Sequence, residues 1–215
     1  MIVTLDGPAG AGKSSAARAL AQRLDFEYMD TGAMYRAVTL AALRAGIDRA
    51  DQKAVAELIA SLRIELPHDQ VFVNNEDITG LIRTAEVTKA SGKIADSPAV
   101  RRFLVGLQQH IAEGRNMVCE GRDQGTIVFP NALCKFFLVA DSGERARRRQ
   151  QEMAERGEVH DLEAILLAQE KRDRRDAARD LAPMVPAADA IMIDSTHLDL
   201  ESVVAKMEVE VRRRM

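Results

Sequence analysis

Hydrophobic residues follow two different periods along the chain. Five short apolar runs are separated by longer stretches in which apolar residues recur three or four positions apart. Short runs of this kind indicate buried strands, and the longer spacing indicates amphipathic helices. The five predicted strands are Ile2–Leu5, Phe26–Met29, Asn116–Glu120, Cys134–Ala140 and Ala190–Ile193. Because strands that alternate with helices pair in parallel, the pattern predicts an α/β fold with a five-stranded parallel sheet covered by helices on both faces.

One segment, residues 63–82, interrupts this alternation. Arg63–Pro67 and Val71–Val73 alternate in the manner of strands, and Asn74-Asn75 suits a tight turn between strands. We expect a small antiparallel β insert here. Helices are predicted at Lys13–Leu24, Ala33–Ala45, about 51–62, Thr84–Ala95 and Pro98–Glu113, with Asp51 and Ser97 as N-caps. The charged stretch Glu144–Arg156 has helical spacing without a core-facing stripe, as a solvated helix would.

Composition narrows the function. The chain has 215 residues, 47% hydrophobic and 29% charged, with a net charge of −3. These values are typical of one globular domain, and the absence of positive net charge argues against nucleic acid or a membrane surface as partner. No apolar run is long enough to span a bilayer, and Met1 leads directly into a strand pattern, so we expect a cytoplasmic protein. Cys119 and Cys134 lack metal-ligand spacing and are expected to be reduced.

The basic residues are unevenly divided. Seven of the 30 are lysines, which leaves 23 arginines. The arginine side chain pairs bidentately with phosphate, so this bias makes phosphorylated small molecules candidate ligands, although a compositional preference explains it equally well.

The most informative motif is Gly7–Ser14, which matches G-x-x-x-x-G-K-[ST] between a predicted strand and a predicted helix. Its glycines turn backbone N–H groups toward one anion, at the positive end of the helix. Lys13 is expected to reach the β- and γ-phosphates of a nucleoside triphosphate, and the Ser14 hydroxyl to bind Mg²⁺. The residues predicted to bind the triphosphate are Gly7, Pro8, Ala9, Gly10, Ala11, Gly12, Lys13, Ser14 and Ser15.

A P-loop does not name the phosphate acceptor. The chain has no Asn-Lys-x-Asp motif, which GTPases use to recognise guanine. Arg122 and Asp123 follow a predicted strand directly, at the sheet edge where ligands of open α/β folds bind. Transfer between two phosphorylated molecules needs arginines to neutralise the gathered charge. The candidates are Arg36, Arg101, Arg122, Arg172, Arg175 and Arg179, each of which taken alone also fits a surface arginine.

Five segments together resemble the bacterial cytidylate kinase family. They are Gly7–Ser14, Asp30–Arg36, Glu76–Thr84, Glu120–Pro130 and Pro183–Ala190, and they extend from the first predicted strand to the last. The P-loop is shared by many families, but the Asp30–Arg36 and Glu120–Pro130 blocks are far more specific. The insert also fits this family, since its members carry a small added sheet in their monophosphate-binding part.

The resemblance implies transfer of the γ-phosphoryl group of ATP to CMP or dCMP, with Mg²⁺. It implies that Arg36, Arg122 and Thr31 hold the acceptor phosphate. Asp123 matches a carboxylate near the reaction centre, Arg101 and Arg179 match residues that read cytosine, and Arg172 and Asp176 match residues that face the ribose. Lys13, Arg122, Asp123 and Arg172 are therefore the expected catalytic residues. Arg175 is an alternative ligand for the ATP phosphates.

The resemblance also implies one P-loop kinase domain that acts as a monomer. Its core would comprise about 1–35, 114–143 and 180–215, and its monophosphate-binding part about 36–113. A short helical lid would cover about 144–160, with Arg145–Arg149 and Arg156 facing phosphate.

One position departs from the family pattern. Gly92 stands where a serine that contacts cytosine is common, and Ser91 lies one residue earlier, which on a helix turns the side chain by about 100°. The CMP-to-UMP preference is thus open. Two other hypotheses remain: a P-loop kinase with a different small-molecule acceptor, and a nucleotide-dependent switch.

Overall fold

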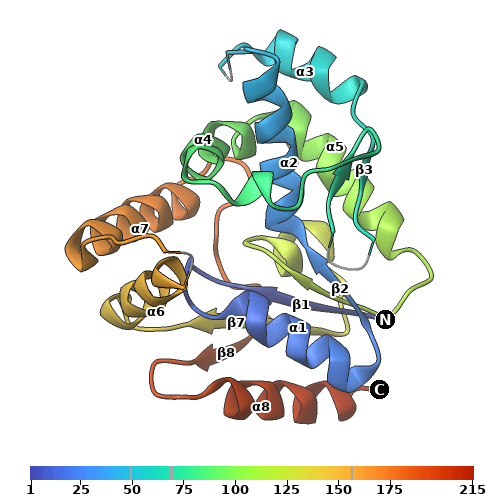
Figure 1. Cartoon of the computed structure of the whole chain (residues 1–215). Coiled ribbons are helices and arrows are strands. Elements are labelled where there is room, and N and C mark those ends of the chain that lie inside the picture. Colours follow the sequence, from blue (N-terminus) through green and yellow to red (C-terminus); the bar gives the residue numbers. More distant parts are fainter. Residues whose placement is uncertain (49, 68–69, 156) are drawn as a thin grey trace. The chain divides into compact units, whose positions relative to one another are not determined.

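A computed structural model describes residues 1–48, 50–67, 70–155 and 157–215. The chain forms two compact units, one made of residues 1–28 and 114–215 and the other of residues 29–113. Each unit has secondary structure of its own (Figure 1).

The first unit is built around the parallel sheet, whose edge strand β2 has its last two residues in the second unit. Its strand order is β2-β6-β1-β7-β8. The strands are β1 (Ile2–Asp6), β2 (Glu27–Asp30), β6 (Met117–Glu120), β7 (Cys134–Val139) and β8 (Ile191–Asp194). Val3 in the central strand pairs with Val118 on one side and with Cys134 on the other. All five strands lie within one residue of their predicted bounds, so the predicted sheet is confirmed.

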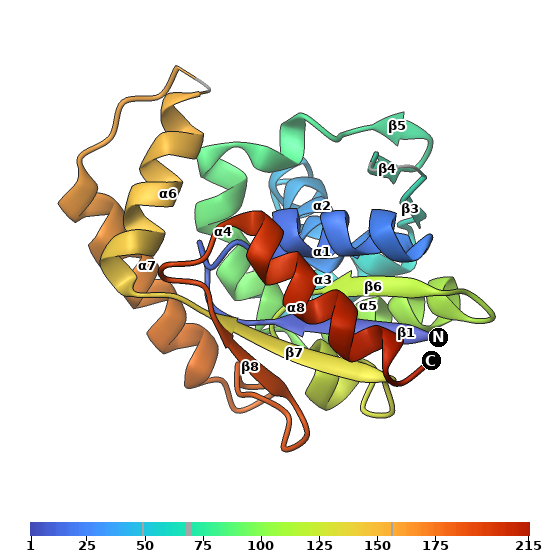
Figure 2. The ribbon, with the colours of Figure 1, turned by 90° about the horizontal axis from the view of Figure 1, so that it is seen from below.

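Two helices of this unit, α1 (Lys13–Leu24) and α8 (Leu200–Arg212), pack side by side against the sheet (Figure 2). Their apolar faces meet the sheet in one core, in which Leu5, Leu20, Phe136 and Met207 are almost fully buried. Burial of side chains of this size stabilises the fold by roughly 2 kcal/mol each. Cys119 and Cys134 are free and buried, as expected.

The same unit contains a second helix pair, α6 (Ser142–Ala154) and α7 (Leu162–Ala177), which lie against each other in Figures 1 and 2. Asp141 accepts from the backbone N–H groups of Gly143 and Glu144, and Asp161 accepts from that of Ala164, so both helices begin at a carboxylate cap.

The second unit holds the predicted insert. Strands β3 (Ile64–Glu65), β4 (Phe72–Val73) and β5 (Glu76–Asp77) form an antiparallel sheet in that order. Asn74 and Asn75 adopt φ values of 50° and 69°, the left-handed geometry of a tight hairpin turn. Strand β5 was not predicted as such because both of its residues are charged and exposed, which leaves no hydrophobic signal.

Helices α2 (Thr31–Arg44), α3 (Gln52–Ala60), 3₁₀ turn η1 (Leu81–Arg83), α4 (Ala85–Ala95) and α5 (Pro98–Ala112) complete this unit. Helix α2 begins two residues before the predicted Ala33, because the Asp30 carboxylate accepts from the N–H of Ala33 at 2.8 Å and caps it. Asp51 caps α3 as predicted. Ser97 precedes α5 but does not cap it with its side chain, which corrects the prediction; its hydroxyl donates to Gln52 Oε1 at 2.6 Å.

Within the described residues, the helices lack the combination of length and apolar character needed to cross a bilayer.

Candidate functional site

The loop from β1 to α1 is shaped by its glycines. Gly7 has a φ of 140° and Gly12 a φ of 90°, values that residues with a side chain rarely adopt. A Cβ at Gly7 would also lie 2.1 Å from the backbone oxygen of Leu138. Gly12 is the N-cap of α1 and brings no side chain to accept from the first N–H groups of that helix. The loop therefore presents backbone donors to an anion at a positive helix end.

Lys13, the first residue of α1, is buried and donates from Nζ to the backbone oxygen of Pro8 at 2.7 Å. Burial, followed by the positive charges of Arg122 and Arg172, lowers the pKa of Lys13 to about 7. Glu120 and Asp6 act in the opposite direction. Because an anion favours the charged form of an amine, a phosphate in this loop would raise the pKa of Lys13 again.

Ser14 and Ser15 lie in the first turn of α1 and are exposed. A hydroxyl at this place suits Mg²⁺, which keeps most of its ligands from phosphate and water and takes few from protein. Among the residues that the structure describes, no three His, Cys, Asp or Glu side chains are grouped to hold a metal. The residues present fit a Mg²⁺ ion that arrives with a nucleotide.

Side chains from α6 and α7 make hydrogen bonds to the backbone of the P-loop. Asp173 accepts from the backbone N–H of Ala9 at 3.3 Å, and Arg145 donates to the backbone oxygen of Ala9 at 2.9 Å and pairs with Asp173. The side chain of Arg145 is 9% exposed. The prediction of a solvated helix face over Glu144–Arg156 is therefore wrong at Arg145, whose guanidinium is buried because carbonyl and carboxylate oxygens accept its hydrogen bonds.

Arg122 and Asp123 follow β6, at the carboxyl edge of the sheet. Arg122 Nε lies 3.4 Å from a carboxylate oxygen of Asp176, and Asp123 is 5% exposed. The backbone oxygen of Asp123 accepts from the N–H of Ile127 at 2.9 Å. The next residues form a π-helical turn, Gln124–Val128, which the hydrophobic pattern did not indicate. Such turns are rare and frequent at functional sites.

A buried carboxylate, Asp176, gathers four arginines in what we call the Asp176 cluster. The closest nitrogen-to-oxygen distances to Asp176 are 3.4 Å from Arg122, 3.7 Å from Arg172, 3.1 Å from Arg175 and 2.8 Å from Arg179. The Asp176 side chain is 2% exposed. Burial alone raises the pKa of Asp176, but the charges of Arg122, Arg179 and Arg172 outweigh it and hold the pKa below its usual value. The carboxylate is therefore ionised and the cluster carries excess positive charge.

Helical spacing placed Arg172, Arg175, Asp176 and Arg179 on one face, but α7 ends at Ala177. Arg179 lies beyond the helix and nevertheless pairs with Asp176. Arg172 and Arg175 lie near Asp176, as predicted, because all three residues belong to α7. Arg179 also lies near Asp176, but the turn after the helix brings it there.

In the second unit, Asp30 organises a smaller group. Its Oδ2 lies 3.1 Å from Arg36 Nη2 and 3.5 Å from Arg83 Nη2, while its Oδ1 caps α2. Thr31, the first residue of α2, is buried. Arg36 and Thr31 were singled out from the sequence, whereas Arg83 was not assigned a role.

Arg101, also in the second unit, is 7% exposed and lies over the ring of Tyr35, 5.7 Å from its centroid. It donates from Nη1 to the backbone oxygen of Ala95 at 3.3 Å. Ser91 is buried in α4, and its hydroxyl donates back to the oxygen of Thr88 at 2.9 Å. This internal bond gives the Ser91 hydroxyl a local partner.

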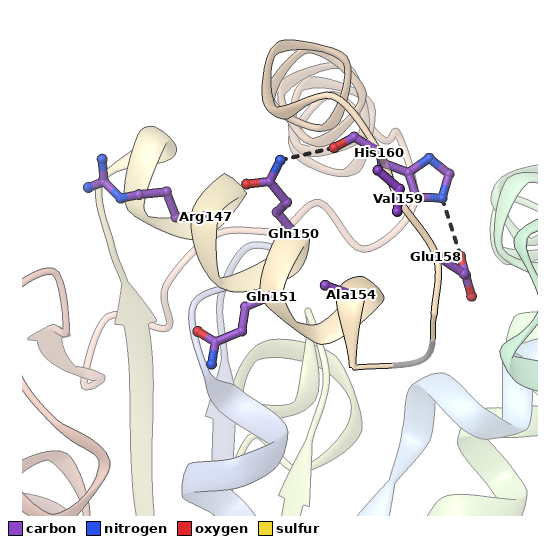
Figure 3. Close-up of a pocket in the computed structure, with 7 residues that line it drawn as sticks. All are labelled: Arg147, Gln150, Gln151, Ala154, Glu158, Val159 and His160. Atoms are coloured by element: carbon purple, nitrogen blue, oxygen red, sulfur yellow. Dashed lines mark hydrogen bonds and ion pairs between the residues drawn. The ribbon is translucent and has the colours of Figure 1, made fainter.

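An open cavity of about 290 Å³ lies in the predicted lid (Figure 3). It is lined by Arg147, Gln150, Gln151, Ala154, Glu158, Val159 and His160. Gln150 donates to the backbone oxygen of His160 at 2.9 Å, and Val159 is 96% exposed. Arg147 is one of the lid arginines predicted to face phosphate, but among the described residues none of the predicted P-loop or acceptor residues lines this cavity, and we assign it no ligand. Arg156, predicted to belong to the lid, lies outside the described residues.

Sequence comparison identifies the family to which these features belong. The profile of a family described as "Cytidylate kinase" matches residues 3–213. The chain belongs to the cytidylate kinase family. A cytidylate kinase of Rhodopirellula baltica is 46% identical over 203 residues, which cover 94% of this chain and 89% of that protein. A cytidylate kinase of Pelotomaculum thermopropionicum is 47% identical over 214 residues, which cover 97% and 95% of the two chains.

Solved structures support the fold of this cytidylate kinase family member. A gluconokinase from Sinorhizobium meliloti matches with a TM-score of 0.51 and 14% identity, over 98% of this chain and 91% of that one. An uncharacterised protein from Eubacterium ventriosum matches with a TM-score of 0.56 and 12% identity, over 100% and 99%. The P-loop kinase fold predicted from the sequence is confirmed.

The structure adds three carboxylates that the sequence analysis missed in this cytidylate kinase family member. Asp6 accepts hydrogen bonds from the backbone N–H groups of Gln124 and Gly125. Asp30 forms an ion pair with Arg36, and Asp173 accepts from the backbone N–H of Ala9 in the P-loop. Asp6 directly follows the predicted strand Ile2–Leu5, and Asp30 follows the predicted strand Phe26–Met29 and opens the Asp30–Arg36 block. These positions were an available signal. Asp173 lay in a charged helix and had no such signal.

Proposed function

We propose that this protein transfers the γ-phosphoryl group of ATP to CMP and dCMP, forming ADP and CDP or dCDP. The family supports the reaction, and the observation that carries it is electrostatic. Arg122 follows β6, the strand that pairs with β1, and it shares the Asp176 carboxylate with Arg172 of α7. The positive charges of both arginines lower the pKa of Lys13 in the P-loop. A hydrolase or switch needs a water at this place, whereas several arginines suit a second phosphate.

For the donor, residues 7–15 hold the ATP phosphates through backbone N–H groups and the Lys13 ammonium. Mg²⁺, when bound, neutralises charge on the β- and γ-phosphates and takes the Ser14 hydroxyl as a ligand. For the acceptor, we assign the CMP phosphate to Thr31, Arg36 and Arg122. We assign the nucleoside to Arg101, Arg172, Asp176 and Arg179.

An oxygen of the CMP phosphate attacks the γ-phosphorus in line, and the bond from that phosphorus to the oxygen of ADP breaks. The attacking oxygen is already anionic, so no general base is required. Lys13, Arg122 and Arg172 stabilise charge on the transferring group, while Asp123 orients the acceptor side. Positioning and charge neutralisation therefore account for catalysis.

The finer expectations follow from the same family. We propose that the protein acts as a monomer and that residues 144–160 close over ATP, which would exclude water and limit ATP hydrolysis. Light scattering would test the first point, since a monomer has a mass of 23.7 kDa.

The decisive experiment measures ADP formation from ATP with CMP, dCMP, UMP, AMP or GMP as acceptor. We expect rapid turnover with CMP and dCMP and little with the purine nucleotides, and the rate with UMP measures the preference that Gly92 leaves open. Absence of turnover with both CMP and dCMP would contradict the proposal. Turnover with an unphosphorylated acceptor would instead support a different P-loop kinase.

A further inference from the structure

Asp6, the last residue of β1, makes contacts that the proposed reaction does not use. Its Oδ1 accepts from the backbone N–H of Gln124 at 2.9 Å, and its Oδ2 accepts from that of Gly125 at 2.8 Å. The residue is 4% exposed. Asp6 also directly precedes Gly7, so the strand end that starts the P-loop is fastened to the segment after β6.

The same strand end holds that segment at a second point. The N–H of Gly121 donates to the backbone oxygen of Leu5 at 3.1 Å. Arg122 and Asp123 are thus the two residues between an anchor at Gly121 and an anchor at Gln124. Two-sided attachment leaves the backbone of these residues little freedom to move relative to β1.

The approach at the second anchor is close. A Cβ on Gly125 would lie 2.9 Å from Oγ1 of Thr4 and 3.2 Å from Cδ of Lys135. Both neighbours are buried. Only glycine allows the Gly125 N–H to come this near to the strand that carries Asp6.

The carboxylate is kept at this place against a cost. Burial raises the pKa of Asp6 to about 6, although the bonds from Gly125 and Gln124 and the charge of Lys13 lower it. The charge of Asp123 raises it further. If this position only had to fill space, an apolar side chain would stabilise the fold more than a carboxylate. A buried carboxylate stabilises only through the groups that it binds.

We propose that Asp6 is a positioning residue, which holds Arg122 and Asp123 at a fixed distance from the phosphates in the P-loop. The inference rests on the proposed function, in which Arg122 and Asp123 face the acceptor. Asp6 itself touches neither nucleotide; it acts through the backbone of Gln124 and Gly125. A single carboxylate thereby links the donor loop to the acceptor segment.

The test compares Asp6→Asn with Val204→Ala. Asparagine keeps the shape of Asp6 but offers only one acceptor oxygen, so one of the two N–H groups loses its partner. Val204 is buried in α8 and makes none of the hydrogen bonds of the anchor, so its truncation lowers stability without removing one of those bonds. For Asp6→Asn we expect kcat with CMP to fall about 100-fold, as for a small misplacement of a catalytic group, with ATP affinity within threefold of wild type.

For Val204→Ala we expect a lower Tm with kcat within twofold of wild type. Amide hydrogen exchange gives a direct readout, since the N–H groups of Gln124 and Gly125 should exchange faster in Asp6→Asn and remain protected in Val204→Ala. A folded Asp6→Asn with wild-type kcat would overturn the inference. So would equal losses of kcat in both variants at equal Tm.

If Asp6→Asn does not fold, Gly125→Ala tests the same anchor from the other side, because the added methyl must push the segment away from Thr4. The same loss of kcat with unchanged ATP affinity is expected, and a wild-type kcat would overturn the inference. Wild-type protein that does not phosphorylate CMP would refute the proposed function. Wild-type turnover together with unchanged turnover in these variants would refute only the role of Asp6.

Discussion

The P-loop and the Asp176 cluster, both in the first unit, prepare for phosphate in opposite ways. The P-loop uses backbone N–H groups, one helix end and one buried lysine whose pKa is lowered to about 7. The Asp176 cluster uses four guanidinium groups, which keep their charge at any pH that the protein tolerates. The P-loop can lose its positive charge while it is empty, because Lys13 can release its proton. The Asp176 cluster cannot, and its arginines need the Asp176 carboxylate to offset their repulsion.

The energetic reason lies in the strength of charge interactions. Two unit charges 4 Å apart interact by roughly 4 kcal/mol near a protein surface, so four guanidiniums around an empty site would repel one another strongly. Asp176 offsets part of that repulsion. A substrate phosphate brings more negative charge to the same arginines and would be attracted by the remaining excess.

The largest expected effect is on the donor side. Lys13→Ala removes the only ammonium group of the P-loop, and we expect kcat to fall about 1,000-fold. Lys206→Ala, which changes an exposed lysine on α8, is the matched control and should leave kcat unchanged. Steady-state kinetics with CMP would measure both. A Lys13→Ala variant that keeps a tenth of the wild-type kcat would show that the lysine is not a catalytic residue.

The second effect is on the acceptor side. Arg122→Ala should lower kcat with CMP about 100-fold while ATP affinity stays within threefold, because the guanidinium acts on the acceptor and the transferring group. Arg122→Lys should recover little, since an ammonium cannot replace a bidentate fork. Comparable losses of ATP affinity and kcat would place Arg122 on the donor side and erase the contrast between the two sites.

A third experiment addresses the carboxylate that holds the arginines. Asp176→Asn leaves four guanidiniums without their shared counter-charge, and we expect a loss of about 3 kcal/mol in the free energy of unfolding. Added inorganic phosphate should restore more stability to this variant than to wild type, because an anion replaces the lost charge. Thermal unfolding with and without phosphate measures this difference. Equal stabilisation of the two proteins would contradict the proposed role of Asp176.

The smallest expected effect is a change in the protonation of Lys13 when ATP binds, which the permanently charged arginines of the Asp176 cluster cannot show. At pH 8, Lys13 with a pKa of about 7 is mostly neutral while the P-loop is empty. ATP should return its pKa to a higher value, so binding should be accompanied by net proton uptake. Calorimetry in buffers of different ionisation enthalpy measures this uptake. Lys13→Arg should abolish it, and wild-type binding without proton uptake would show that the lysine is charged before ATP arrives.

The same contrast explains what the sequence could predict. The P-loop is contiguous, so Gly7–Ser14 was recognised with its strand and helix, and all five strands of the parallel sheet followed from short apolar runs. The Asp176 cluster joins Arg122 to residues more than 40 positions away, as the Arg122–Asp176 pair shows. Hydrophobic periodicity does not report such contacts, and family resemblance was needed to select the right arginines.

The residues that escaped prediction share one property. Asp6, Asp30 and Asp173 act on backbone groups or on other side chains, and a sequence motif records the residue that meets a ligand more readily than the one that holds it. The buried Arg145 was missed for a related reason, because its partners, Ala9 and Asp173, come from elsewhere in the chain.

The central claim is that the γ-phosphoryl group passes directly from ATP to the phosphate of CMP. The measurement that tests it most directly is chromatographic counting of ADP and CDP formed from ATP and CMP in one reaction. The account predicts equal amounts of the two products, and almost no ADP when CMP is left out. ADP without an equal amount of CDP would contradict it, because the phosphoryl group would then be passing to water or to another acceptor.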